Sequence, residues 1–431
     1  MISVKNLKNN LRNGKYDGWL SHVYCKPITD MTYQRDRIIR IAEEFCHTFE
    51  KTEETEVAIF SAPGRTELGG NHTDHQRGKV LTGSVDLDAL CAAAPNGTEM
   101  VNICSEGYGM TSISSRELAK VDGEENTTVS LIRGILSAVV ERGYTVSGFD
   151  AYITSDVPGG SGLSSSACFE VLIGVILNGL FCKGELALHE LAQIGQYAEN
   201  VYFGKPSGLM DQMGCAMGGM ISIDFRDKDH PDFHQIDFDF MKTGHALCII
   251  DTGADHADMT DDYAAIPAEM KAVAAYFGKE VLCEVDEEEF RRCVPEIRRQ
   301  TGDRAILRAL HYFTDCRRVD RMVTALEQDN FAAYLRQVSS SGHSSYMFLQ
   351  NITTGRDPAE QPVAVALAMA GSYLNGEGAR RVHGGGFAGT IQAYVPLPLL
   401  ESFREGMDAL LGEGACRVTS IRPVGGCTLI D

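Results

Sequence analysis

The chain has 431 residues, 44% hydrophobic and 23% charged, a composition typical of an ordinary globular protein. With 39 Lys and Arg against 59 Asp and Glu, the formal net charge is −20, which argues against a nucleic-acid or anionic-membrane partner because either would need a basic face. No basic-then-apolar segment opens the chain and no apolar run could span a bilayer, so we expect a cytosolic protein, and no obligate protein partner is indicated.

The length predicts two domains, and the mixture of helices and strands without strict alternation predicts an α+β fold in each. We interpret residues 1–30, which are polar and poorly periodic, as an N-terminal extension with little core of its own. Residues 31–255 are expected to form the first domain and residues 256–431 the second. The thirteen cysteines are scattered singly, so we expect reduced thiols, and no His/Cys cluster suggests zinc.

Hydrophobic periodicity predicts the elements in chain order. After a helix that includes residues 38–49 come strands at 57–60, 80–94 and 100–104, a helix at 129–140 and a strand from 149. The first domain is expected to close with strands at 220–225 and 246–251. The second half is richer in helices, with segments at 263–277, 287–299, 306–326, 362–374 and 397–411 and strands at 390–395 and 418–421.

A glycine- and serine-rich loop lies between the strand from residue 149 and an apolar helix at 167–180. Its sequence is Ser155-Asp-Val-Pro-Gly-Gly-Ser-Gly-Leu-Ser-Ser-Ser-Ala-Cys-Phe-Glu170. Glycines let a backbone approach an anion closely, and the first turn of a helix offers unpaired N–H groups at its positive end. The loop lacks the Lys-Ser/Thr ending of a Walker loop and the spacing of a Rossmann fingerprint. The pattern therefore predicts a phosphate-binding loop of another kind.

Three stretches resemble the GHMP family of small-molecule kinases. The loop is similar to the family's Pro-x-Gly-x-Gly-Leu-Ser-Ser-Ser-Ala motif, and Gly384-Gly-Gly-Phe-Ala-Gly389 to its Gly-Gly-Gly-Phe-Gly-Gly. The third, Ala62-Pro-Gly-Arg-Thr-Glu-Leu-Gly-Gly-Asn-His-Thr-Asp74, resembles the galactokinase signature Pro-Gly-Arg-Val-Asn-Leu-Ile-Gly-Glu-His-Thr-Asp. Their order over more than 300 residues implies a two-lobed kinase with its active site in the cleft.

This resemblance implies a reaction in which ATP phosphorylates the anomeric hydroxyl of a galactose-type sugar. A guanidinium at Arg65 would neutralise charge on the transferring phosphoryl group. Asp211, which matches the family's Gly-Ile-Met-Asp-Gln, would accept the proton of the attacking hydroxyl or orient that hydroxyl, and a nearby Arg65 would keep it ionised.

The resemblance also implies an ATP and magnesium site. ATP would contact the loop residues Pro158, Gly159, Gly160, Ser161, Gly162, Leu163, Ser164, Ser165 and Ser166. Magnesium would bridge the phosphates and take the Ser166 hydroxyl and the Glu199 carboxylate as protein ligands. Glu199 could instead be a solvated surface residue.

Sugar-binding residues implied in the same way are Asn71, His72, Asp74, Gly208 and Tyr263. The family's Tyr-Asn-x-Arg-Arg is replaced after Tyr263, which weakens that correspondence. Asn71 stands where galactokinases carry a glutamate that meets the sugar's sixth carbon. The loss of that charge, with Arg77 and Lys79 nearby, would make the pocket more favourable for a carboxylate on the sugar.

Three functions therefore stay open from the sequence. A galactokinase-like enzyme is the first, and a galacturonate 1-kinase is the second, because His72-x-Asp-His-Gln76 also resembles the plant galacturonate kinases of the family. The third is a regulator that binds sugar and ATP without turnover. The presence of Ser166 and Asp211 argues against the third.

Overall fold

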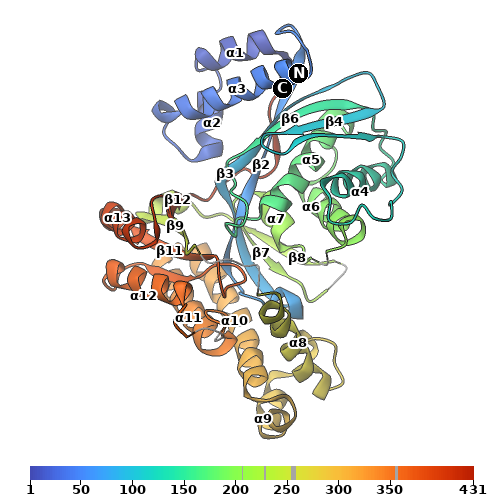
Figure 1. Ribbon diagram of the computed structural model, residues 1–431. Coiled ribbons are helices and arrows are strands. Elements are labelled where there is room, and N and C mark those ends of the chain that lie inside the picture. Colours follow the sequence, from blue (N-terminus) through green and yellow to red (C-terminus); the bar gives the residue numbers. More distant parts are fainter. Residues whose placement is uncertain (206, 228–229, 254–258, 355–357) are drawn as a thin grey trace.

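The computed structural model describes residues 1–205, 207–227, 230–253, 259–354 and 358–431. Figure 1 shows two sheets, each covered by helices, with the two chain ends close together. The ends meet because strands β1 and β13 both pair with β2.

The first sheet has nine strands among the described residues. They run in the order β1-β2-β3-β6-β4-β5, with β13 also paired to β2 and β7 lying between β3 and β8. Only the β4–β6 pair is parallel. Their bounds are β1 (Ile2–Ser3), β2 (Glu56–Gly69), β3 (Lys79–Pro95), β4 (Met100–Ser105), β5 (Gly109–Ser114), β6 (Phe149–Ser155), β7 (Met220–Asp224), β8 (Asp232–Ile236) and β13 (Cys427–Ile430).

Both faces of the central strands β2, β3 and β6 are buried, and the alternation of side chains along β2 shows why. Ala58 and Phe60 pack into a core with the helices on one face, whereas Val57 and Ile59 pack into a second core on the other. A strand buried on both faces reads as a continuous apolar run. The first face carries α4 (Thr128–Glu141), α5 (Ser165–Phe181), α6 (Leu188–Tyr197), the π-helical turn η3 (Ala198–Phe203) and α7 (Met210–Met217).

The opposite face carries the N-terminal helices, and here the expectation of an extension with little core is wrong. Val4, Leu7 and Leu11 lie three to four residues apart on one side of the first helix and are fully buried. They pack with Ile38 and Ile41 against the sheet. The elements are α1 (Val4–Arg12), α2 (Asp17–Tyr24), the short turn η1 (Ile28–Asp30) and α3 (Thr32–Thr48).

The second sheet is antiparallel, in the order β10-β11-β9-β12. Its strands are β9 (His245–Asp251), β10 (Ala379–Val382), β11 (Thr390–Pro396) and β12 (Cys416–Thr419). Strand β9, expected to close the first domain, pairs instead with β11 and β12. We therefore propose that the second domain begins before β9. The boundary expected between residues 255 and 256 lies outside the described residues.

Helices again cover both faces of this sheet. Ile391, Ala393 and Val395 of β11 pack toward α12 and α13, whereas Tyr394 packs toward α10 and α11. The helices on this sheet are α10 (Asp303–Glu327), α11 (Phe331–Ser344), α12 (Pro362–Leu374) and α13 (Leu400–Leu411), whereas α8 (Thr260–Tyr276) and α9 (Glu287–Thr301) pack against α10. Short helical turns are η2 (Asp74–Gln76), η4 (Phe240–Thr243), η5 (Leu282–Glu284), η6 (Ser345–Leu349) and η7 (Leu397–Leu399).

Two expectations from composition can be compared with these elements. All thirteen cysteines are free thiols, as expected. In the parts of the chain that the structure describes, no helix is both long and apolar enough to cross a bilayer.

Candidate active site

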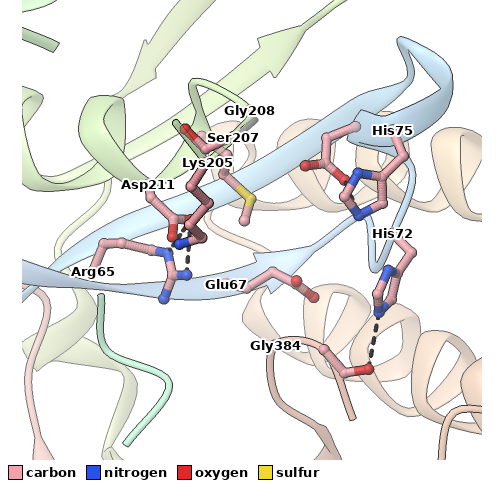
Figure 2. A pocket seen from close by; sticks show the side chains of 12 residues that line it. Arg65, Glu67, His72, His75, Lys205, Ser207, Gly208, Asp211 and Gly384 are labelled. Carbon is pink, nitrogen blue, oxygen red and sulfur yellow. Dashed lines mark hydrogen bonds and ion pairs between the residues drawn. The ribbon is translucent and has the colours of Figure 1, made fainter. Parts of the chain in front are cut away.

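A pocket of about 480 Å³ lies where the end of β2, helix α7 and the β10–β11 loop meet (Figure 2). Three carboxylates, two cations and two histidines are among the side chains that line it. Among the described residues the lining is Arg65, Glu67, His72, Asp74, His75, Lys205, Ser207, Gly208, Met210, Asp211, Gly384 and Gly385. Sequence segments more than 300 residues apart thus form one site.

The predicted phosphate loop connects β6 to the first turn of α5. Gly160 and Gly162 have φ angles of 74° and 73°, and Ser164 also lies in the left-handed region with φ 56°. The space beside Gly159 and Gly160 is open, so the loop exposes its backbone there. Residues Pro158 to Ser166 therefore form a turn that ends on a helix N-terminus, the arrangement that binds phosphate.

The inner half of the loop is held against the second sheet. A Cβ on Gly162 would lie 2.9 Å from Thr390 Oγ1 and 3.0 Å from His383 Nδ1, so only glycine fits here without displacement. The Arg65 amide donates to the Leu163 carbonyl at 3.0 Å. The loop is thus fixed relative to β2 and to the loop after β10.

Arg65 and Asp211, the two expected catalytic residues, form a direct ion pair. Arg65 Nε donates to Asp211 Oδ1 at 2.9 Å, and Nη2 lies 2.8 Å from the same oxygen. Ser164 Oγ donates to Asp211 Oδ2 at 2.6 Å, and Arg65 Nη1 donates to the Gly162 carbonyl. Burial alone would raise the pKa of Asp211, but the Arg65 charge and the Ser164 hydrogen bond outweigh it and lower that pKa. The carboxylate is therefore ionised at neutral pH.

Glu199, the expected metal ligand, is buried rather than a solvated surface residue. Its Oε1 lies 2.9 Å from Lys205 Nζ, and its Oε2 accepts from Gln212 Nε2 at 3.0 Å. The same amide donates to Glu170 Oε2 at 2.9 Å. Burial, followed by the charge of Glu199, raises the pKa of Glu170 well above its ordinary value. Ser166 lies exposed in the first turn of α5.

His72, Asp74 and Gly208 line the other end of the pocket. His72 Nε2 donates to the Gly385 carbonyl at 2.9 Å, which leaves Nδ1 as a buried acceptor without a hydrogen-bond partner among the described residues. Burial, with His75 adding to it, lowers the pKa of His72 to about 4. A Cβ on Gly208 would lie 3.1 Å from Asp74 Oδ2, so the two residues are neighbours.

Three expected sugar-binding side chains hold the backbone of the glycine loop at 384–386. Asn71 Nδ2 donates to the Gly384 carbonyl at 2.7 Å, His72 donates to the Gly385 carbonyl, and Tyr263 Oη donates to the Gly386 carbonyl at 2.7 Å. The Tyr263 ring packs against Phe387 and beside Gly385, outside the pocket lining. The structure thus places Tyr263 behind the loop.

Asn71 does not face the pocket either. Its side chain is fully buried, and its Oδ1 accepts from Asn351 Nδ2 at 2.8 Å and from Ser345 Oγ at 3.2 Å. Arg77 pairs with Glu280 and Glu284, and Lys79 pairs with Asp320. Neither cation lines the pocket. We expected Arg77, Lys79 and the missing charge at residue 71 to favour a ligand carboxylate in the pocket. This expectation is wrong, because none of the three side chains lines the pocket.

Glu67 is a pocket residue that the sequence reasoning missed. It lies on β2 between the Arg65 end and the His72 end (Figure 2). Its carboxylate pairs with the buried Arg381 guanidinium and accepts from Asn71 Nδ2 at 3.1 Å. Burial raises the pKa of Glu67, although Arg381 and Arg65 oppose this. The sequence did carry a signal for Glu67, because the galactokinase signature has Asn where this chain has Glu67.

Two family profiles match the stretches that build this pocket. Residues 130–219 match the GHMP kinases N terminal domain, and residues 43–95 match the galactokinase galactose-binding signature. The first span contains the phosphate loop and Asp211, and the second contains Arg65 to Asp74.

Similar proteins cover most of the chain. A galactokinase of Streptomyces coelicolor is 29% identical over 374 residues, which is 85% of this chain and 93% of that protein. The crystal structure of Lactococcus lactis galactokinase complexed with galactose superposes with a TM-score of 0.74 at 25% identity, covering 90% of this chain and 98% of that one. Methanococcus jannaschii mevalonate kinase shares the fold, with a TM-score of 0.59 at 14% identity over 84% of this chain and 97% of that one. The chain is therefore similar to GHMP kinases over most of its length, and to galactokinases among them.

Proposed function

We propose that this chain is an ATP-dependent kinase that transfers the γ-phosphoryl group to the anomeric hydroxyl of galactose. The observation that carries the proposal is the Arg65–Asp211 pair, which lies between the phosphate loop and the pocket. One end of the site offers a helix N-terminus to phosphate, and the other offers carboxylate acceptors to hydroxyls.

The chemistry follows from the positions of these two side chains. Asp211 is 37% exposed, so it can meet a sugar hydroxyl while Arg65 keeps it ionised. Asp211 accepts the hydroxyl proton as the sugar oxygen attacks the phosphorus, and the bond to the ADP oxygen breaks. Arg65, whose Nη1 also reaches the loop backbone, stabilises negative charge on the transferring group.

ATP and magnesium are part of this proposal. Among the described residues no group of three or more His, Cys, Asp or Glu could hold a metal ion alone. A carboxylate at Glu199 and a hydroxyl at Ser166 nevertheless fit Mg²⁺, which takes few protein oxygens and completes its shell with phosphate and water. Glu199 Oε1 pairs with the Lys205 ammonium, and Mg²⁺ would take the place of that cation. When bound, the metal would neutralise phosphate charge.

His72 and Asp74 are proposed to bind the sugar. His72 lines the pocket, and its low pKa keeps the ring neutral. Asp74, beside Gly208, accepts hydroxyls, which rewards one stereochemistry over its epimer. Gly208 keeps the space above Asp74 open.

A screen of purified protein against galactose, galacturonate, arabinose and N-acetylgalactosamine, read as ADP release, tests the proposal. Galactose is expected to give the highest kcat/KM. ADP release that depends on none of these sugars would overturn it and would favour a regulator that binds without turnover. A cytosolic location stays a prediction.

A further inference from the structure

Residues 67 and 71 exchange the two side chains that the galactokinase signature has at these positions. The signature places Asn at the first and Glu at the second, whereas this chain has Glu67 and Asn71. In the structure the pair is in contact, with Asn71 Nδ2 at 3.1 Å from Glu67 Oε1 and 3.3 Å from Oε2. The negative charge is thus kept and moved to the strand that lines the pocket.

The surroundings of Glu67 hold that charge in place. Arg381, fully buried, pairs with Glu67 Oε1 through Nη2. The other oxygen, Oε2, accepts one hydrogen bond from the described residues, the long contact from Asn71, and a carboxylate oxygen can accept two. Glu67 therefore keeps acceptor capacity toward the pocket that it lines.

The acidic side chains at this end of the pocket offer only acceptors to a ligand, and the Arg381 cation that pairs with Glu67 does not line the pocket. Glu67 and Asp74 are the carboxylates at this end, and the lining cations Arg65 and Lys205 are paired with Asp211 and Glu199. His72 is neutral because of its low pKa. An added ligand carboxylate would meet like charge, and the repulsion is stronger in a partly enclosed pocket than in water because the effective dielectric is lower.

We propose that Glu67 is the specificity-determining residue of this pocket, accepting hydroxyls of a neutral hexose and rejecting a hexuronic acid. This rests on the proposed function, because it names the substrate class of the same site. Asn71 acts as a positioning residue that holds the Glu67 carboxylate and the glycine loop.

Calorimetric titration with D-galactose and D-galacturonate, without ATP and at a pH where the acid is ionised, tests the proposal. The wild-type chain is expected to bind galactose more tightly than galacturonate. Glu67→Gln keeps the shape and removes the charge, so this preference should fall about tenfold or more. Glu99→Gln is a matched control, since that carboxylate pairs with Arg116 on the surface, and its preference should equal that of the wild type.

The double variant E67N/N71E restores the order of the signature and covers the case in which Glu67→Gln does not fold beside the buried Arg381. It should lose the preference as Glu67→Gln does, because its charge then stands at residue 71, whose side chain lies outside the pocket lining. An equal loss of affinity for both sugars in Glu67→Gln, or a kept preference in the double variant, would overturn the proposal. ADP release by the wild type with galactose tests the kinase function separately, since the ratio of the two sugar affinities is measured without turnover.

Discussion

Two buried arginine–carboxylate clusters flank the first sheet, and they differ in what the carboxylate can still accept. Asp88 on β3 is fully buried, and four side chains donate to it: those of Tyr24, Arg37, Ser61 and Arg422. Asp211 binds Arg65 and Ser164 and stays 37% exposed to the pocket. The first cluster is closed by protein groups and the second is open.

The comparison shows how one type of interaction serves two purposes. The donors to Asp88 come from α2, α3, β2 and the segment before β13, so this cluster ties the N-terminal helices and the C-terminal segment to the sheet. Asp211 has fewer partners and keeps the capacity to meet a hydroxyl. We therefore expect substitutions at Asp88 to change folding and those at Asp211 to change chemistry.

Asp211→Asn should give the largest effect on turnover. The change keeps the shape and removes the base, so we expect kcat to fall by about 10² to 10⁴ while ATP and galactose bind near normally. Steady-state kinetics together with equilibrium sugar binding would measure this. A variant with more than about a tenth of the wild-type kcat, a deficit below roughly 1.4 kcal/mol, would contradict base catalysis.

Asp88→Asn should give the largest effect on stability. Two buried guanidinium groups would then face a neutral amide, which costs about 3–5 kcal/mol in the free energy of unfolding. Denaturant unfolding measures this, with Glu99→Gln as an exposed control that should change by less than about 1 kcal/mol. The molecules that remain folded should keep the wild-type kcat. A loss of kcat without a loss of stability would contradict a purely structural role for the Asp88 cluster.

His72 predicts a pH dependence of stability. Its folded pKa of about 4 lies below the ordinary value, so the unfolded chain binds the proton first and stability falls as the pH drops from about 6.5 toward 4. At pH 5 this amounts to about 2 kcal/mol relative to pH 7. His72→Gln can still donate to the Gly385 carbonyl and does not titrate, so its loss of stability over that range should be smaller by this amount. Equal pH profiles would contradict the low pKa.

The smallest predicted effect concerns magnesium. Ser166→Ala removes one hard oxygen ligand and Glu199→Gln removes a charge, so each should raise the magnesium concentration for half-maximal rate by several-fold. Titration of the initial rate with magnesium at fixed ATP measures this. If both variants keep the wild-type requirement, the metal is held by other groups.

Much of the fold could be predicted because its signals are local. The loop at 155–170 carries its glycines, strand and helix in one stretch, and helix α12 begins and ends where the periodicity predicts. Strand β9 is expected to close the first domain, but it pairs with β11, which lies about 140 residues later, and pairing over that distance leaves no local pattern. Helices α1 and α2 were missed although Val4, Leu7 and Leu11 have helical spacing, because polar neighbours masked it.

The site was predictable for residues that stand inside a family motif. Arg65 and Asp211 meet as expected, and Glu199 lies buried near them through Gln212. The orientation of Asn71 could not be predicted, because it depends on Ser345 and Asn351 from elements far along the chain. Because those side chains hold the Asn71 amide outside the pocket lining, Glu67 is the residue of this pair that lines the pocket.

We propose that this pocket transfers phosphate to the anomeric oxygen of galactose, and phosphorus NMR of the reaction products tests this transfer most directly. Wild-type protein with ATP, magnesium and galactose should yield ADP and one sugar phosphate whose phosphorus couples to the anomeric proton. Asp211→Asn should form that product at least about 100-fold more slowly. A phosphate on another carbon, or ADP formed without any sugar phosphate, would contradict the account.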